Sequence, residues 1–160
     1  MDKYHMRKQE RQITDENELQ EILFQGKFAV ISVCRNDEPY IVTLSYGFDK
    51  AGKALYFHTG PQGLKMDFLR QNANVCATII EDRGYKKGEC GHEYRSVVIF
   101  GKMKILEDLE EKKHGMEVLL GHLEENPDPM KERNLKHDQV YQKIAVLKLE
   151  IDEITGKKGQ

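Results

Sequence analysis

The sequence lacks tryptophan and has only three cysteines and four prolines among its 160 residues. An odd number of cysteines at irregular spacing excludes a small scaffold held together by disulfides. No apolar run approaches the roughly 18 residues that a membrane-spanning helix needs. The first twelve residues, MDKYHMRKQERQ, lack the apolar core of a signal peptide. We therefore expect a cytoplasmic protein that does not enter a membrane.

Neither sign of charge dominates, because 25 lysines and arginines stand against 27 aspartates and glutamates. A net charge of −2 gives no electrostatic reason to expect nucleic acid or a membrane surface as a partner. The length fits one domain with a real core. We expect this domain to span residues 1–160, with its core between about residues 13 and 155.

Apolar residues recur at helical spacing in three segments and at strand spacing in six. The predicted helices are residues 14–25, capped by Thr14 or Asp15, then 63–70, then 108–126, capped by Asp108. The predicted strands are 28–34, 40–48, 53–59, 74–81, 94–107 and 141–152. Short connections among the first three strands favour antiparallel pairing, and closure of the sheet would hide its edges. The fold class predicted is mainly β, a six-stranded antiparallel barrel with flanking helices.

Two features interrupt this pattern of strands. Residues 82–93, DRGYKKGECGHE, are polar, contain three glycines and have no periodicity, so we expect a mobile flap or a binding loop. Gly101 lies in the middle of a predicted strand, which indicates a bulge or a close approach of another backbone.

The stretch ALYFHTGPQGLKMDFLRQN, residues 54–72, places several polar groups at a strand-to-helix junction. Thr59 supplies a hydroxyl, Gly60 and Gly63 leave room for backbone N–H groups, and Lys65 supplies a cation. These are the groups with which a helix start binds phosphate. The alternative is a tight turn with a solvated lysine. His58 beside it is either a ligand contact or a hydrogen-bonded structural residue.

Other catalytic patterns are absent from the sequence. Cys90 and His92 lack the further pair of ligands that a structural zinc needs, so we expect no metal. Ser96 is not part of a Gly-x-Ser-x-Gly elbow. No side chain stands out as a general acid or base, and the catalytic residues are left unassigned.

Four segments in this order and spacing carry a family resemblance: PYIVTLSYGF, LYFHTGPQGLKMDFLRQNANVCATI, YRSVVIFGKMKILED and EITGKK. Together they resemble the FMN-binding split-barrel proteins, and most closely the branch related to pyridoxamine 5′-phosphate oxidase that includes the nitroimidazole-resistance reductases. The resemblance covers about residues 7–158. It implies a split barrel that forms a homodimer, with FMN at the subunit interface.

The resemblance also implies which positions contact the flavin. Backbone along the isoalloxazine would come from Val42, Thr43, Leu44 and Ser45. Contacts around the phosphate would come from His58, Thr59, Gly63 and Lys65. Contacts from the far side of the cleft, across the dimer, would come from Tyr94 and Ser96.

For activity, the resemblance implies an FMN-dependent oxidoreductase that takes electrons from NAD(P)H and reduces a small-molecule acceptor such as a nitro-aromatic. A non-catalytic sensor or carrier that binds FMN or haem is the alternative. The chain ends in EITGKKGQ and lacks the arginine-bearing segment that recognises pyridoxal phosphate. Oxidation of pyridoxamine phosphate is therefore not expected.

Overall fold

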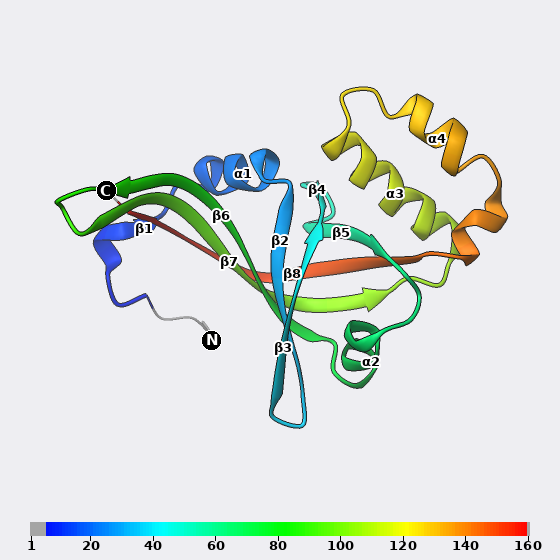
Figure 1. Ribbon diagram of the computed structural model, residues 1–160, viewed down its shortest axis with the longest axis horizontal. Helices are drawn as coiled ribbons and strands as arrows, with labels where there is room; N and C mark the ends of the chain where they lie inside the picture. The colour runs from blue at the N-terminus through cyan, green and yellow to red at the C-terminus, as the bar shows by residue number, and fades with distance from the viewer. Residues whose placement is uncertain (1–5, 160) are drawn as a thin grey trace.

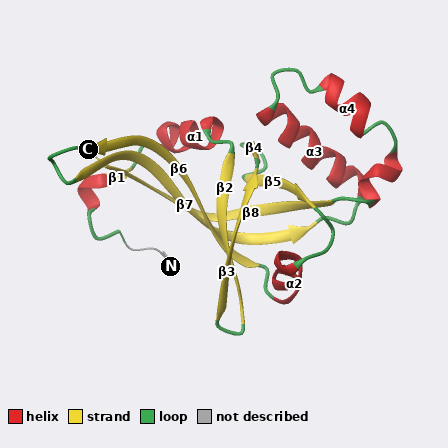
Figure 2. Cartoon of the chain, in the orientation of Figure 1, coloured by secondary structure: helices red, strands yellow, loops and turns green. Residues whose placement is uncertain are grey.

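A computed structural model describes residues 6–159 and places eight strands in one antiparallel sheet with four α-helices around it (Figures 1 and 2). The strands are β1 (Gln12–Ile13), β2 (Phe28–Arg35), β3 (Glu38–Ser45), β4 (Gly47–Asp49), β5 (Ala54–Thr59), β6 (Asn74–Lys86), β7 (Gly91–Ile105) and β8 (Ala145–Gly159). The helices are α1 (Glu16–Gln25), α2 (Leu64–Gln71), α3 (Leu109–Leu123) and α4 (Asp128–Asn134), with 3-10 turns at Gln9–Arg11 and Asp138–Gln142.

The mainly β, antiparallel prediction is confirmed, but the sheet is not a closed barrel. Its strands follow the order β3-β2-β6-β7-β8-β5-β4, and β1 pairs with the outer end of β8. The strand predicted over 40–48 is divided in two at Tyr46, which turns into the core and donates a hydrogen bond to Leu23 O at 2.6 Å. Burial of this phenol raises the pKa of Tyr46.

The prediction of a loop over residues 82–93 is wrong. β6 and β7 run on as a two-stranded ribbon, with Asp82 opposite Tyr94 and Tyr85 opposite His92, and leave only a short turn between Lys86 and Gly91. The ribbon is visible at the left of Figure 1. Many of its side chains are exposed, so no apolar alternation marks it in the sequence. The backbone ladder and polar side-chain contacts across it, such as His92 with Asp82 at 2.6 Å, maintain this pairing, and apolar periodicity does not reveal either.

Helices cover the sheet on two sides of its long strands. The larger core cluster packs α1 and α2 against β2, β6 and β7 through residues such as Ile22, Phe68 and Ile31. A smaller cluster packs α3 against β5 and β8 through Met116, Leu119 and others. Asp15 and Asp108 cap α1 and α3 as predicted. Within residues 6–159 no helix is long and apolar enough to cross a membrane.

Candidate functional site

The junction between β5 and α2 holds the polar residues singled out in the sequence. β5 reaches it paired with β8, with His58 opposite Val146 and Thr59 opposite Ala145. The side chain of His58 is exposed and that of Thr59 is half-buried. The paired backbone therefore fixes both residues at the end of the strand, next to the loop that begins α2.

Gly63 gives the helix start an open geometry. Its φ of +124° and ψ of 173° form a conformation that only glycine adopts readily, and a Cβ atom there would meet nothing within 4 Å. The amides of Met66 and Asp67 bond to the Gly63 carbonyl. Within residues 6–159 no hydrogen bond is formed by the first amides of the helix, those of Leu64 and Lys65, so they are available to an anion.

Lys65 is the cation nearest to these amides along the chain. Its side chain is half-buried and forms no ion pair with any residue between 6 and 159. The next basic residue, Arg70, is already engaged, since it donates to Pro61 O at 3.0 Å and pairs with Asp67 at 3.5 Å. Arg70 thus holds the loop in place, whereas Lys65 is not engaged in this way within the described residues.

α2 is joined to β3 through aromatic packing. The ring of Phe68 lies 5.5 Å from that of Tyr40 on β3, and the Arg35 guanidinium lies 4.2 Å above the Phe68 ring. β3 is also an edge strand of the sheet, so one side of its backbone has no strand partner among residues 6–159. An edge strand offers free N–H and C=O groups beside the start of α2.

The side chains predicted on β3 divide by face. Val42 and Leu44 pack against the core, while Thr43 and Ser45 are exposed. A planar ligand along this strand would meet the backbone of all four residues, but only the side chains of Thr43 and Ser45.

The outer face of the sheet carries exposed apolar side chains that the sequence analysis did not single out. Phe28, Ile41 and Ile80 are 58%, 61% and 59% exposed. Val30 is opposite both Thr43 and Thr78, and Ser32 is opposite both Ile41 and Cys76, so these positions share one face of β2, β3 and β6. We call this surface the outer face. The helices α1 and α2 pack on its reverse side.

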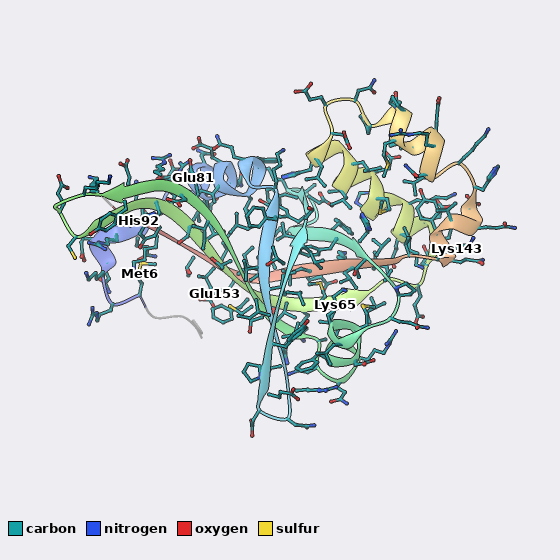
Figure 3. The ribbon with its side chains drawn as sticks, viewed as in Figure 1. Met6, Lys65, Glu81, His92, Lys143 and Glu153 are labelled. Carbon is teal, nitrogen blue, oxygen red and sulfur yellow. The ribbon has the colours of Figure 1, made fainter. Side chains whose placement is uncertain are left out.

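Tyr94 and Ser96 lie apart from the other predicted residues. Ser96 is opposite Ile80, which places it on the outer face, whereas Tyr94 is further along the ribbon, opposite Asp82. Figure 3 shows His92, near Tyr94 in the chain, at the far end of the molecule from Lys65. Within one chain the structure brings together the β3 residues and the β5–α2 residues, but not Tyr94. The flavin contacts assigned to all ten residues stay predictions.

Arg95, between Tyr94 and Ser96, is a buried residue that the sequence analysis did not single out. Its side chain is 7% exposed and pairs with Glu81 on β6 and with Glu21 and Glu18 on α1. Alternation with the buried Val97 and Ile99 was the available signal, because it places Arg95 on the inward side of β7. Arg95 therefore contributes to the fold and not to the candidate site.

Comparison with known proteins agrees with this architecture. The structure superposes on a candidate 5-nitroimidazole antibiotic resistance protein from Bacteroides thetaiotaomicron with a TM-score of 0.76 and 26% identity, over 92% of this chain and 86% of that one. It also matches the flavocytochrome Anf3 of Azotobacter vinelandii with a TM-score of 0.78 and 18% identity, over 97% and 72% of the two chains. The fold is thus of the split-barrel type found in these proteins.

The sequence comparisons identify the family. An uncharacterized protein of Rhizobium meliloti is 28% identical over 151 residues, which cover 91% of this chain and 93% of that one. The family model described as pyridoxamine 5′-phosphate oxidase matches residues 15–158. The chain belongs to this family, as the resemblance in its sequence indicated.

Proposed function

We propose that the chain binds FMN and acts as a flavin-dependent oxidoreductase, passing electrons from NAD(P)H to a small oxidised acceptor such as a nitro-aromatic. A bound flavin would supply the redox chemistry, and the protein would supply binding, orientation and exclusion of water. Membership of the pyridoxamine 5′-phosphate oxidase family supports a flavin cofactor. The likeness to a candidate 5-nitroimidazole resistance protein supports an acceptor of the nitro-aromatic class.

The observation that carries this proposal is the start of α2. The amides of Leu64 and Lys65 and the Lys65 side chain, which have no hydrogen-bond or ion-pair partner within residues 6–159, follow directly on the open Gly63 backbone, and a phosphate would bind there. Along the adjacent free edge of β3, backbone N–H and C=O groups have no strand partner within residues 6–159. Their regular spacing suits the hydrogen-bonding groups on the polar edge of a flavin ring. The phosphate and the ring would thus be held by neighbouring elements.

The same proposal includes a homodimer in which the outer faces of two chains cover the flavin. β2 reads FAVISVC, apolar on both faces, and such strands are normally buried on both sides. In the single chain only its inner side is covered, which leaves Phe28 exposed. A second copy would bury this face, and Ser96 and Tyr94 of each chain would then approach the cleft from across the interface.

The experiment that tests the proposal is the visible spectrum of the protein purified without added cofactor, followed by titration with FMN, FAD and haem. Flavin bands, or saturable uptake of one FMN per chain, would support it. Rapid oxidation of NAD(P)H that depends on a nitro-aromatic would support the reductase, while flavin binding without turnover would favour a sensor or carrier. A protein that takes up haem alone, or no cofactor, would refute the proposal.

The variant Lys65→Ala is expected to weaken FMN binding by about 1.5–3 kcal/mol, the contribution of a charge-assisted hydrogen bond to phosphate. Titration calorimetry would measure the change. Riboflavin, which has no phosphate, should bind the variant and the parent equally. Lys136→Ala is the matched control, since Lys136 is an exposed lysine in the connection after α4 and outside the β5–α2 junction. Unchanged FMN affinity in Lys65→Ala would show that the phosphate lies elsewhere.

The variant Ile41→Glu is expected to convert the dimer to monomers, because it places a charge on the apolar surface that the second copy would cover. Light scattering coupled to size-exclusion chromatography would report the mass, and FMN affinity should fall together with dimerisation. Ile41→Thr, which keeps a β-branched side chain without charge, is the control and should stay dimeric. A dimer that persists in Ile41→Glu would place the interface on another surface.

A further inference from the structure

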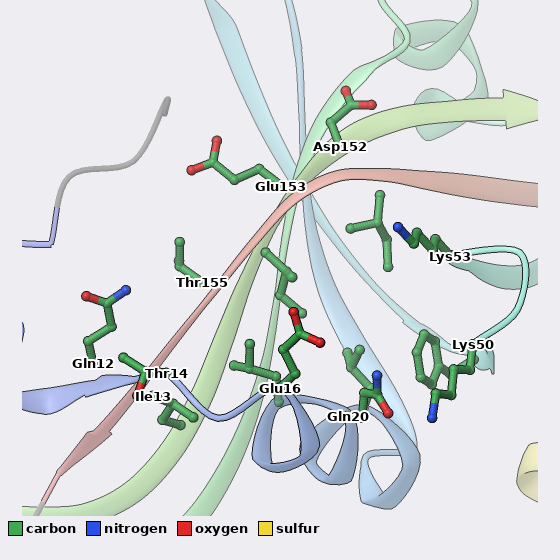
Figure 4. Close-up of a pocket in the computed structure, with 15 residues that line it drawn as sticks. Gln12, Ile13, Thr14, Glu16, Gln20, Lys50, Lys53, Asp152, Glu153 and Thr155 are labelled. Carbon is green, nitrogen blue, oxygen red and sulfur yellow. The ribbon is translucent and has the colours of Figure 1, made fainter. Parts of the chain in front are cut away.

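A recess opens where the sheet has a gap along one edge of β8. β5 pairs with β8 as far as Glu150, and β1 pairs with it from Gly156, so residues 151–155 have no strand partner on that edge within the described chain. The recess has a volume of about 630 Å³ and lies between β8, the N-terminal half of α1 and the β4–β5 hairpin (Figure 4). Small-molecule sites commonly have this size.

The floor of the recess is apolar. Leu23 is buried there, and Leu19, Phe48 and Ile151 pack against the core around it. Phe48 is further held by the ring of Phe24 at a centroid distance of 4.9 Å. A ligand with an apolar body would therefore bury carbon surface against side chains that are already fixed.

Charged groups of both signs face the recess from opposite elements. Lys50 and Lys53 come from the β4–β5 hairpin and Glu16 from the first turn of α1, and none of the three forms an ion pair within residues 6–159. In Figure 4 the side chain of Lys53 extends toward β8, and that of Glu16 extends from α1 into the space between Lys53 and Thr155. The carboxylates of Asp152 and Glu153 are directed away from α1.

The hairpin that carries the lysines is anchored to β8. Ile151 N donates to Lys53 O at 3.1 Å, and Lys53 has a φ of +48°, a left-handed conformation that costs energy in a residue with a side chain. The adjacent turn is closed by Asp49, which accepts from Gly52 N at 3.0 Å. These contacts therefore fix the backbone of Lys53 at the rim of the recess.

We propose that this recess binds a small organic zwitterion with an apolar body, whose carboxylate meets Lys53 and whose ammonium group meets Glu16. A ligand with a single charge would be attracted to the lysine or to Glu16 and repelled by the other. A zwitterion places an opposite charge beside each of them. None of the ten residues assigned to flavin binding lines the recess, so this inference does not rest on the proposed function.

The test uses three naphthalene probes of one size: 6-(aminomethyl)-2-naphthoate, 6-methyl-2-naphthoate and (6-methylnaphthalen-2-yl)methylamine. Each is titrated into the full-length protein, and amide chemical shifts in nitrogen–proton correlation spectra report both the affinity and the site. We expect the zwitterion to bind about tenfold more tightly than either single-charge probe. The largest shifts should fall in residues 12–20, 50–53 and 151–155.

Charge-neutralising variants sharpen the test. The variant Lys53→Gln should reduce the affinity for the zwitterion to that for the amine, and Glu16→Gln should reduce it to that for the carboxylate. Lys87→Gln and Glu10→Gln, at exposed positions outside the recess, are the controls and should change neither. Three equal affinities, shifts confined to the outer face, or no saturable shift at millimolar probe would each overturn the inference.

Discussion

Replacing Gly101 of β7 with alanine is expected to lower the free energy of unfolding by about 3 kcal/mol, a large part of the stability of a domain of this size. A Cβ atom at this position would overlap the backbone oxygen of Glu150 and lie 2.9 Å from Leu149 Cδ1. A side chain could rotate away from such a contact, but a carbonyl paired within the sheet cannot. The strands β7 and β8 would have to separate where they hold the two halves of the sheet together.

The cause of this close approach is a β-bulge. Phe100 is opposite Glu153 and Gly101 is opposite Ile151, so Asp152 is the extra residue on β8. The bulge bends β8 at the edge where the recess opens. The structure thus confirms both interpretations of Gly101 from the sequence: a bulge lies in the strand pair, and another backbone approaches closely.

Urea unfolding followed by far-UV circular dichroism would measure the effect of Gly101→Ala, since the chain has no tryptophan to report by fluorescence. Gly121→Ala is the matched control. Gly121 lies within α3, and a Cβ atom there meets nothing within 4 Å, so alanine should stabilise the helix by up to about 1 kcal/mol. If Gly101→Ala unfolds at the same urea concentration as the parent, the two backbones are further apart than the structure places them.

The elements that sequence reasoning predicted are those whose stability comes from a periodic apolar pattern or a local cap. β2, β5 and the inner part of β7 alternate or run apolar, and Asp15 and Asp108 accept from the helix amides that follow them. The β6–β7 ribbon was missed because its pairing depends on backbone hydrogen bonds between polar residues. Arg95 was missed because its partners Glu21 and Glu81 are distant in sequence.

The candidate site was predictable only where its parts are contiguous in the chain. His58, Thr59, Gly63 and Lys65 are within eight positions, so the sequence places them together. The outer face is different, since Phe28, Ile41 and Ile80 come from three strands and look like ordinary core residues. Only the register of the sheet shows that they share a surface that the chain itself does not cover. The recess along β8 likewise depends on where β5 ends and β1 begins.

Replacing Arg95 with methionine is expected to lower the free energy of unfolding by about 3 kcal/mol at neutral pH. Arg95 Nε donates to Glu81 at 2.5 Å and Arg95 Nη1 donates to Glu21 at 3.0 Å, which ties α1 to the ribbon. Without the guanidinium, Glu21 loses its basic partner, while Glu81 keeps Arg83 at 3.1 Å and Glu18 keeps Lys158 at 3.0 Å. We expect this loss to lie near the lower end of the range for removing one partner of a buried ion pair. The glutamate side chains are partly exposed, so water solvates them once Arg95 is removed.

The pH dependence separates this ionic effect from simple loss of packing. Hydrogen bonds from Arg95 lower the pKa of both Glu21 and Glu81. A carboxyl whose pKa is lower in the folded state binds protons more readily when the chain is unfolded. Its contribution to the free energy of unfolding is therefore complete above the ordinary glutamate pKa of about 4.3. That contribution is lost as the pH falls through the lowered folded value. The stability gap between the parent and Arg95→Met should therefore narrow on acidification.

Unfolding free energies of the two proteins at about pH 7 and about pH 3 would measure this narrowing, with the parent losing more stability than the variant. Other carboxylates with lowered pKa values, such as Asp49 and Glu150, act equally in both proteins and cancel in the difference. Arg133→Met removes an exposed arginine that forms no ion pair within residues 6–159, and it should change neither value. A gap that is the same at both pH values would mean that Arg95 stabilises α1 and the ribbon by its packing and not by its charge.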